Sequence, residues 1–361
     1  MFIKILCTGL MILTALGIFA EEVRWPVPPS GYSSASPNIP KGTLSAVVNY
    51  PTRNYGNRPC RIYMPPGYSK TRSEKYPVLY LHHGIGGNEN AWTSQNGQAE
   101  GNADKVMDFL YAQEDLEVTP MIVVMPMGNM TNTSGDTWQN FEDVLINDLA
   151  PYIEENYNGS SDPNTRAIAG LSMGGGQTLN FGYKNPKVFT WIGAFSPAPN
   201  TIAAGTNIKD MTSVKANVHL NFLAAGTGGG TEPQCLNTAR TYHNYLEQNG
   251  VTNLYLQIEQ GVGHERENWN RQLYNFAQRI FKGITKATQP ELAKTEPANI
   301  TPLNIHGTVT VRIGPGLTPS SVNAVRSGGG FPGPQIFTLD GRRITLFQQE
   351  KAVMQSIDRT R

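Results

Sequence analysis

Short apolar runs alternate with longer amphipathic stretches along most of the chain. The amphipathic stretches carry apolar residues at helical spacing, and the short runs are typical of strands buried on both faces. This alternation predicts an α/β protein with a mainly parallel sheet that helices cover on both faces. Functional residues are then expected at the C-terminal ends of the strands. The expected central strands are "YPVLYLHH", "MIVVMP", "RAIAG", "TWIGAFS", "VHLNFLAAG" and "LYLQIE", and the expected helices span 103–113, 141–157, 173–185, 235–250 and 267–283.

The two ends of the chain differ in pattern from this alternating region, 43–283. Residues 1–20 have one early lysine, a long apolar run and Ala20, which is typical of a secretory signal peptide and predicts a secreted protein. Residues 21–42 are rich in proline and serine and are expected to form an extended leader arm. Residues 284–303 are interpreted as a linker, and 304–361, with short strand-like runs and a mild basic excess, as a small β-rich module. Its stretch "FTLDGRRITLF" resembles the terminal sorting or attachment modules of secreted proteins, which implies such a role for it.

Composition excludes some classes of function. The 361 residues carry a formal net charge of +1, so no nucleic-acid partner is expected. Beyond the first twenty residues no segment is long and apolar enough to predict a membrane span. Of the three cysteines, Cys7 lies within the expected signal peptide. Cys60 and Cys235 remain, and the sequence leaves open whether they form a disulfide or stay as two buried thiols.

The stretch "AIAGLSMGGGQ" contains the strongest chemical signal. Ser172 lies between Gly170 and Gly174, after an apolar strand and before an expected helix. A sharp strand-to-helix turn presents a serine hydroxyl openly and requires small residues two positions away on both sides, which gives the G-x-S-x-G nucleophile elbow. Ser172 is therefore the predicted nucleophile.

A serine nucleophile needs a base, and His264 is the predicted one. It lies in "EQGVGHERENW", between the last expected strand and the last helix, where the order Ser…acid…His of α/β-hydrolases puts the base. His82 and His83 are adjacent on one strand end and point to opposite faces, and no H-E-x-x-H spacing occurs, so neither a metal site nor a cofactor is expected. The other histidines lie in a strand, a helix and beyond the linker: His219, His243 and His306.

An oxyanion needs two backbone N–H donors near the nucleophile. One is expected from Met173, which directly follows the serine. The other is expected from Ile85 in the glycine-rich loop after the "YLHH" strand.

Several blocks in order carry a resemblance to a known family. "YMPPGYS", "YPVLYLHHGIGGNENAW", "AIAGLSMGGGQTLNFGYKNP", "FSPAPNT" and "GVGHERENW" resemble the family 1 carbohydrate esterases, in particular the feruloyl esterase domains attached to bacterial xylanases. The resemblance covers roughly residues 43–283. It implies an α/β-hydrolase fold, no cofactor and hydrolysis of esters on plant cell-wall xylan, with the family's nucleophile at Ser172 and its histidine at His264.

The sequence departs from this family at the acid of the triad. The family has an aspartate after the "GT" that follows the seventh strand, whereas this chain has "AAGTGGGTEPQ". Glu232 is the only carboxylate in that stretch and is the predicted third member, because a glutamate can also orient a histidine.

The resemblance implies a secreted feruloyl esterase that acts on feruloylated or acetylated xylan and oligosaccharide esters through an acyl-serine. Trp92 and Trp138 are candidates to flank an aromatic acid, the latter in the loop 126–138. An acetyl xylan esterase with the same machinery is the nearest alternative, and an acyltransferase is another. The signal peptide disfavours the cytosolic formylglutathione hydrolases. A non-catalytic xylan-binding module is the alternative from another class, favoured only by the missing aspartate.

Overall fold

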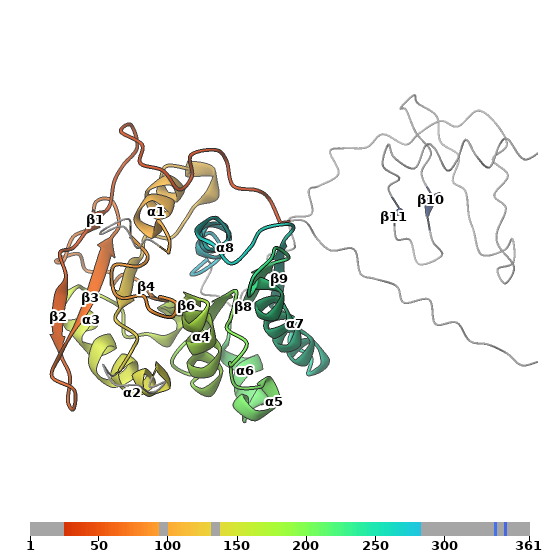
Figure 1. The fold of residues 1–361 in the computed structure, drawn as a ribbon. Helices are drawn as coiled ribbons and strands as arrows, with labels where there is room; N and C mark the ends of the chain where they lie inside the picture. The colour runs from red at the N-terminus through yellow and green to blue at the C-terminus, as the bar shows by residue number, and fades with distance from the viewer. Residues whose placement is uncertain (1–24, 94–99, 131–137, 283–335, 338–342, 345–361) are drawn as a thin grey trace, which may run out of the picture. The chain divides into compact units, whose positions relative to one another are not determined.

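A nine-stranded mixed sheet forms the centre of the protein (Figure 1). The computed structural model describes residues 25–93, 100–130, 138–282, 336–337 and 343–344. The strand order is β1-β3-β5-β4-β6-β7-β8-β9, with β2 beside β3, and the strands from β5 to β9 in this order are parallel. The strands are β1 (Thr43–Leu44), β2 (Val48–Pro51), β3 (Asn57–Met64), β4 (Val78–His82), β5 (Ile122–Pro126), β6 (Arg166–Leu171), β7 (Trp191–Phe195), β8 (Leu220–Gly226) and β9 (Leu254–Glu259).

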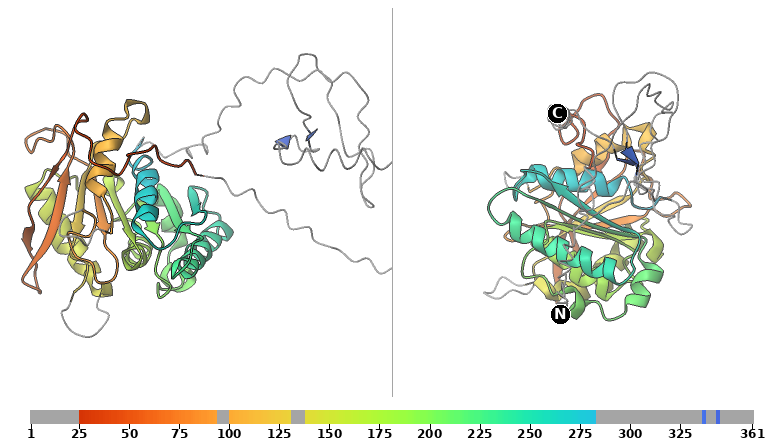
Figure 2. Two further views of the ribbon diagram at one scale, coloured as in Figure 1. Left: turned by 45° about the horizontal axis from the view of Figure 1, so that its top comes forward. Right: turned by 90° about the vertical axis from the view of Figure 1, so that its right-hand side faces the viewer.

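Helices cover both faces of this sheet, as the alternating pattern predicts. Helices α1 and α8 lie on one face, and α2, α3, α4 and α7 lie on the other; the right-hand view of Figure 2 shows α8 (cyan) and α7 (green) with the strands between them. The helical segments are α1 (Ala103–Tyr111), η2 (Glu114–Leu116), η3 (Trp138–Asn140), α2 (Phe141–Val144), η4 (Leu145–Leu149), α3 (Ala150–Asn156), η5 (Pro163–Thr165), α4 (Met173–Lys184), α5 (Ala204–Asn207), α6 (Met211–Asn217), α7 (Glu232–Gln248) and α8 (Arg266–Ala277).

The core consists of two apolar layers, one on each face of the sheet. Successive side chains of a strand point to opposite faces, so Val78 and Tyr80 join one layer while Leu79 and Leu81 join the other. All five residues of β4 are buried, which explains why the central strands are continuous apolar runs rather than alternating ones. The α/β-hydrolase fold predicted from the sequence is thereby confirmed, apart from its C-terminal appendage.

Two details differ from the expected elements. The single helix expected over 141–157 is three consecutive segments, because a π-helical turn, η4, separates α2 from α3. Helix α7 begins at Glu232 rather than at Cys235, so Glu232 is the first residue of a helix and not part of the preceding loop.

The leader residues that the structure describes, 25–42, pack on the domain. The indole N–H of Trp25 donates a hydrogen bond to the carbonyl oxygen of Leu256 at 3.0 Å, and Tyr32 is 5% exposed and contacts the ring of Tyr274 edge to face. The packing of these two aromatic rings, Tyr32 buried and Trp25 partly buried, holds the leader on the face that carries α8.

The chain divides into two compact units, Met1–Gln289 and Pro290–Arg361. In the second unit the structure describes only a strand pair, β10 (Ile336–Phe337) with β11 (Arg343–Ile344). The expected signal peptide and linker lie outside the described residues, as does most of the expected C-terminal module. None of the described helices is long and apolar enough to span a membrane.

Candidate active site

Ser172 lies at the turn between β6 and α4, at the C-terminal edge of the parallel strands. Its φ of 52° and ψ of −116° place a non-glycine residue in a strained conformation, which costs on the order of 1–3 kcal/mol. A Cβ on Gly170 would lie 2.6 Å from the carbonyl oxygen of Gly174, and one on Gly174 would lie 2.5 Å from that of His83. The two glycines of the motif are therefore required because the backbone passes too close for any side chain.

His264 brings its imidazole to the serine hydroxyl. Its Nε2 lies 2.9 Å from the Oγ of Ser172, and 92 residues separate the two in sequence. The histidine is carried by the segment between β9 and α8, and its side chain is 20% exposed, whereas Ser172 is 9% exposed. This distance lies within the range in which a base accepts a hydroxyl proton.

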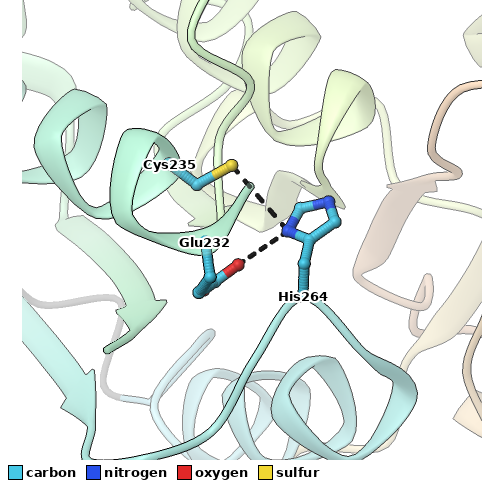
Figure 3. A group of neighbouring side chains, drawn as sticks. All are labelled: Glu232, Cys235 and His264. Atoms are coloured by element: carbon cyan, nitrogen blue, oxygen red, sulfur yellow. Dashed lines mark hydrogen bonds and ion pairs between the residues drawn. The ribbon is translucent and has the colours of Figure 1, made fainter. Parts of the chain in front are cut away.

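Glu232 contacts the other ring nitrogen of His264. Its Oε2 lies 2.6 Å from Nδ1, and the residue is fully buried (Figure 3). A carboxylate in this position holds the proton on Nδ1 and leaves the Nε2 lone pair free for the serine. The structure thus brings Ser172, His264 and Glu232 into one continuous chain of hydrogen bonds.

The loop between β8 and α7 explains why the acid lies at a helix start. A Cβ on Gly226 would lie 2.0 Å from the carbonyl oxygen of Val262, and one on Gly228 would lie 2.5 Å from the amide nitrogen of Gly263. The backbone of this loop therefore packs directly against the segment that carries His264. Side chains are excluded there, and the longer glutamate reaches the imidazole from the first turn of α7.

The second carboxylate oxygen of Glu232 is held by three donors that the sequence reasoning missed. Oε1 accepts hydrogen bonds from the Ser196 hydroxyl at 2.7 Å, from the Asn268 side-chain amide at 2.8 Å and from the backbone N–H of Gly226. Asn268 also donates to the carbonyl oxygen of Gly263 at 3.0 Å. Such donors compensate a buried carboxylate for its lost hydration, and Asn268 also ties the acid to the histidine segment.

Sequence signals for these donors exist but are weak. Ser196 directly follows β7 at the same sheet edge as Ser172, and its φ of 43° marks a second strained turn. Asn268 lies four residues after His264, in the block "GVGHERENW". Position alone marks both residues, and nothing in their type predicts a bond to Glu232.

Asp210 and Glu265, two carboxylates that are alternatives to Glu232, have partners other than His264. The Asp210 carboxylate caps the N-terminus of α6 through the backbone N–H of Ser213 at 2.9 Å. The Glu265 carboxylate accepts from the N–H of Gly263 at 3.4 Å. Among the described residues, the carboxylate that meets His264 is that of Glu232.

The adjacent histidines His82 and His83 hold two loops beside the serine. Nε2 of His83 accepts from the N–H of Gly128 at 3.0 Å, so Nδ1 carries the proton and donates to the carbonyl oxygen of Gly84 at 2.7 Å. His82 pairs through Nδ1 with Oε1 of Gln177 at 2.9 Å, and this glutamine donates to the Gly128 carbonyl at 3.0 Å. Burial lowers the pKa of both histidines to about 4, so both are neutral at pH 7.

The glycine-rich loop after β4 lies against the nucleophile. A Cβ on Gly84 would lie 3.4 Å from the Cβ of Ser172, and the N–H of Gly84 donates to Oε2 of Glu100 at 2.8 Å. Burial raises the pKa of Glu100, while this N–H and the nearby His264 act in the opposite direction. Ile85, in the same loop, has a side chain that is 74% exposed.

The two candidate substrate-flanking tryptophans are buried. Trp92 is 1% exposed, donates its indole N–H to the carbonyl oxygen of His82 at 2.8 Å and contacts Phe195 edge to face. Trp138 is 2% exposed, and its ring would be 3.4 Å from a Cβ on Gly176. Neither indole offers an exposed face to an aromatic acid in this structure, because both fill the packing behind the loops. The middle of the loop 126–138 lies outside the described residues.

Cys60 and Cys235, the two cysteines among the described residues, are free thiols rather than a disulfide. Cys60 lies on β3 and is fully buried, and Cys235 lies in the first turn of α7 and is 1% exposed. Burial raises the pKa of both thiols to about 12, with a contribution from Glu232 at Cys235 and from Glu89 at Cys60. The second of the two sequence alternatives is therefore the one that the structure contains.

Comparison with known proteins identifies relatives with this architecture. The family described as "Putative esterase" matches residues 54–280. The "Endo-1,4-beta-xylanase/feruloyl esterase" of Xylanibacter ruminicola is 33% identical over 258 residues, which is 68% of this chain but only 32% of that relative, so the match spans about a third of its length.

Solved structures show the same fold. A CE1 ferulic acid esterase from Anaeromyces mucronatus, in complex with ferulic acid, superimposes with a TM-score of 0.57 at 21% identity, covering 70% of this chain and 96% of that one. A mutant feruloyl esterase module from Clostridium thermocellum, complexed with sinapinate, also gives 0.57, at 19% identity, covering 72% and 95% of the two chains. The predicted resemblance to the feruloyl esterase domains of the family 1 carbohydrate esterases is confirmed. With a match over residues 54–280, the chain belongs to the Esterase family.

Proposed function

We propose that the chain is a secreted serine esterase that removes feruloyl groups from plant cell-wall xylan. The observation that carries the proposal is the chain of hydrogen bonds from Ser172 through His264 to Glu232. It lies at the sheet edge where α/β proteins place their ligands. Feruloyl groups and xylan come from the likeness to the xylanase-linked relative, whose name includes both activities.

The proposed reaction passes through an acyl-serine. Nε2 of His264 accepts the hydroxyl proton as Oγ of Ser172 attacks the ester carbonyl carbon. The oxyanion then accepts hydrogen bonds from the backbone N–H groups of Ile85 and Met173. The imidazolium returns its proton to the leaving sugar alcohol, and the feruloyl group stays on Oγ. A water molecule, activated by the same imidazole, then releases ferulate and restores the serine.

Two features of the site support the oxyanion assignment. Met173 is the first residue of α4, where N–H groups have no partner within the helix and the helix dipole favours negative charge. The loop with Ile85 is brought beside Ser172 at Gly84. The Gly84 carbonyl accepts from His83 and the Gly84 N–H donates to Glu100, and these two bonds fix the backbone of the loop. Donors that are already held in place need little free energy of reorganisation when the oxyanion forms.

A paired assay tests the acyl specificity. The purified full chain is given methyl ferulate and acetylated xylan under the same conditions, with Ser172→Ala as the blank. The proposal predicts the larger kcat/KM on methyl ferulate. Preference for acetylated xylan would instead establish the acetyl xylan esterase alternative, and failure on both substrates, with no covalent label on Ser172, would favour the non-catalytic binding module.

The compact first unit leads to a separate prediction for the C-terminal region. Truncation after Gly283 is expected to leave kcat/KM on a small soluble ester within about twofold, because the described site lies wholly within Met1–Gln289. Secretion, or retention on cells or fibre, should decrease instead. Aggregation of the truncated chain, or loss of its turnover on the small ester, would show that residues 304–361 belong to the catalytic fold.

A further inference from the structure

The thiol of Cys235 lies beside the ring nitrogen that the catalytic acid contacts. Figure 3 shows Cys235 and Glu232, both from the start of α7, pointing toward the same edge of the His264 ring. Sγ lies 3.8 Å from Nδ1, and the donor atoms of the three residues all lie within 4.8 Å of one another. The reaction proposed above uses no thiol. We propose that these three residues form an inhibitory binding site for Zn²⁺.

The first turn of α7 supplies two of the three ligands. Glu232 and Cys235 are three residues apart on a helix and therefore project from the same side of it. A carboxylate three residues before a second ligand is a spacing that helical metal sites use. His264 joins from a segment 29 residues further along the chain than Cys235, which explains why the local spacing of histidines predicts no metal site.

The two donor distances at Nδ1 of His264 can be compared with those of a zinc site. Ligand atoms of a tetrahedral zinc site are about 3.4–3.6 Å apart, given bond lengths of about 2.0–2.3 Å. The distance of 3.8 Å from Sγ to Nδ1 already fits, whereas the distance of 2.6 Å from Oε2 to Nδ1 is too short for both atoms to bind one ion. Zinc would therefore replace the hydrogen bond between Glu232 and His264 rather than add to it, and a water molecule would complete the four ligands.

The chemistry of the donors selects the ion. A thiolate and an imidazole favour Zn²⁺ over Mg²⁺ or Ca²⁺, which prefer oxygen ligands only. Cys235 is 1% exposed and Glu232 is fully buried, so both are shielded from bulk water, whereas the His264 side chain is 20% exposed. Gly229 and Gly230, in the loop that leads to Glu232, are exposed, so this site lies close to the surface.

Zinc at this position would switch off the base. The metal takes the lone pair of Nδ1, so the neutral imidazole of His264 carries its proton on Nε2 and cannot accept the proton of Ser172. The Cys235 thiol loses its proton to solvent when the sulfur binds, so one proton is released for each ion bound. The loss of activity rests on the proposed function of the site, whereas the binding of zinc does not.

The test compares the full chain with two variants, in each of which one cysteine is replaced. Cys235→Ala removes a proposed ligand, and Cys60→Ala removes the other buried thiol as a matched control. For each protein the rate on a small ester is measured against free Zn²⁺ set by a metal buffer and is divided by its own zinc-free rate. Bound zinc per chain is measured separately after gel filtration, so that zinc binding is determined even if the chain hydrolyses no ester.

The expected results separate the site from unspecific inhibition. The unaltered chain and Cys60→Ala should each retain one zinc, lose most of their activity and regain it with EDTA, and Mg²⁺ should have no effect. Cys235→Ala should need at least about tenfold more zinc, since even residues that only support a ligand contribute 10–100-fold to metal affinity. The proposal would be overturned if Cys235→Ala were as sensitive to zinc as the unaltered chain, or if this variant retained one zinc per chain. If Cys235→Ala does not fold, Cys235→Ser is used in its place.

Discussion

Ser172→Ala should retain the fold of the protein and lose its esterase activity by about 10⁶ in kcat, the size of loss typical when a catalytic serine is removed from a triad. Alanine, like serine, carries a Cβ, so the substitution does not relieve the strain of the turn at a φ of 52° as glycine would. The substitution removes the hydrogen bond of 2.9 Å between the hydroxyl and Nε2 of His264, which the reaction requires. The measurement is the rate on methyl ferulate, with thermal unfolding of both proteins as a check of the fold.

Ser69→Ala is a matched control. Ser69 is exposed, and its backbone N–H donates to the hydroxyl of Tyr76. Tyr76 lies just before the start of β4, at the opposite end of the sheet from Ser172. This variant should keep its full activity. Turnover above about one per cent in a folded Ser172→Ala protein would contradict the assignment, because residual catalysis without the nucleophile is far smaller.

Glu232→Gln should lower kcat by about 10⁴, less than the loss of the serine. Glutamine can present an N–H to Nδ1 of His264, which favours the tautomer with its proton on Nε2, and that nitrogen then cannot act as a base. The three donors on Oε1 also lose their carboxylate partner. The variant should still react with a fluorophosphonate at Ser172, but slowly, and the labelling rate measures the remaining reactivity of the serine.

Glu265→Gln provides the control for charge. Glu265 is adjacent to His264, but its carboxylate contacts the N–H of Gly263 instead of the imidazole. Removal of this charge should change kcat by less than about threefold, since Glu265 is exposed and substitutions on the surface usually have small effects. If Glu265→Gln were the slower of the two variants, the acid of the triad would not be Glu232.

Sequence patterns were sufficient for the fold and for selecting Ser172, His264 and Glu232, which the structure joins by hydrogen bonds. The apolar runs predicted the parallel strands because those strands are buried on both faces, and the glycines around Ser172 predicted a turn because close backbone packing leaves no alternative. His264 was found because it follows Ser172 and Glu232 in the chain order expected of α/β-hydrolases, and the fold brings its imidazole next to Ser172.

The surroundings of the acid could not be predicted in the same way. The donors Ser196 and Asn268 come from the end of β7 and from α8, and only the packed structure brings them to Glu232. The start of α7 at Glu232, rather than at Cys235, depends on how the preceding glycines pack against Gly263. Trp92 was expected at a substrate surface, but its indole packs against Gly101 and Phe195. Gly101 has no side chain, which leaves room for the ring, and burial of the apolar ring is favourable.

Covalent labelling of Ser172 tests the central claim most directly. The purified full chain is treated with a fluorophosphonate, digested and mapped by mass spectrometry, beside Ser172→Ala under the same conditions. The activated serine predicts one adduct per chain, located on the peptide that contains Ser172, and none on the variant. A folded chain that acquires no adduct, or acquires it at another residue, would contradict the assignment of Ser172, His264 and Glu232 as an esterase site.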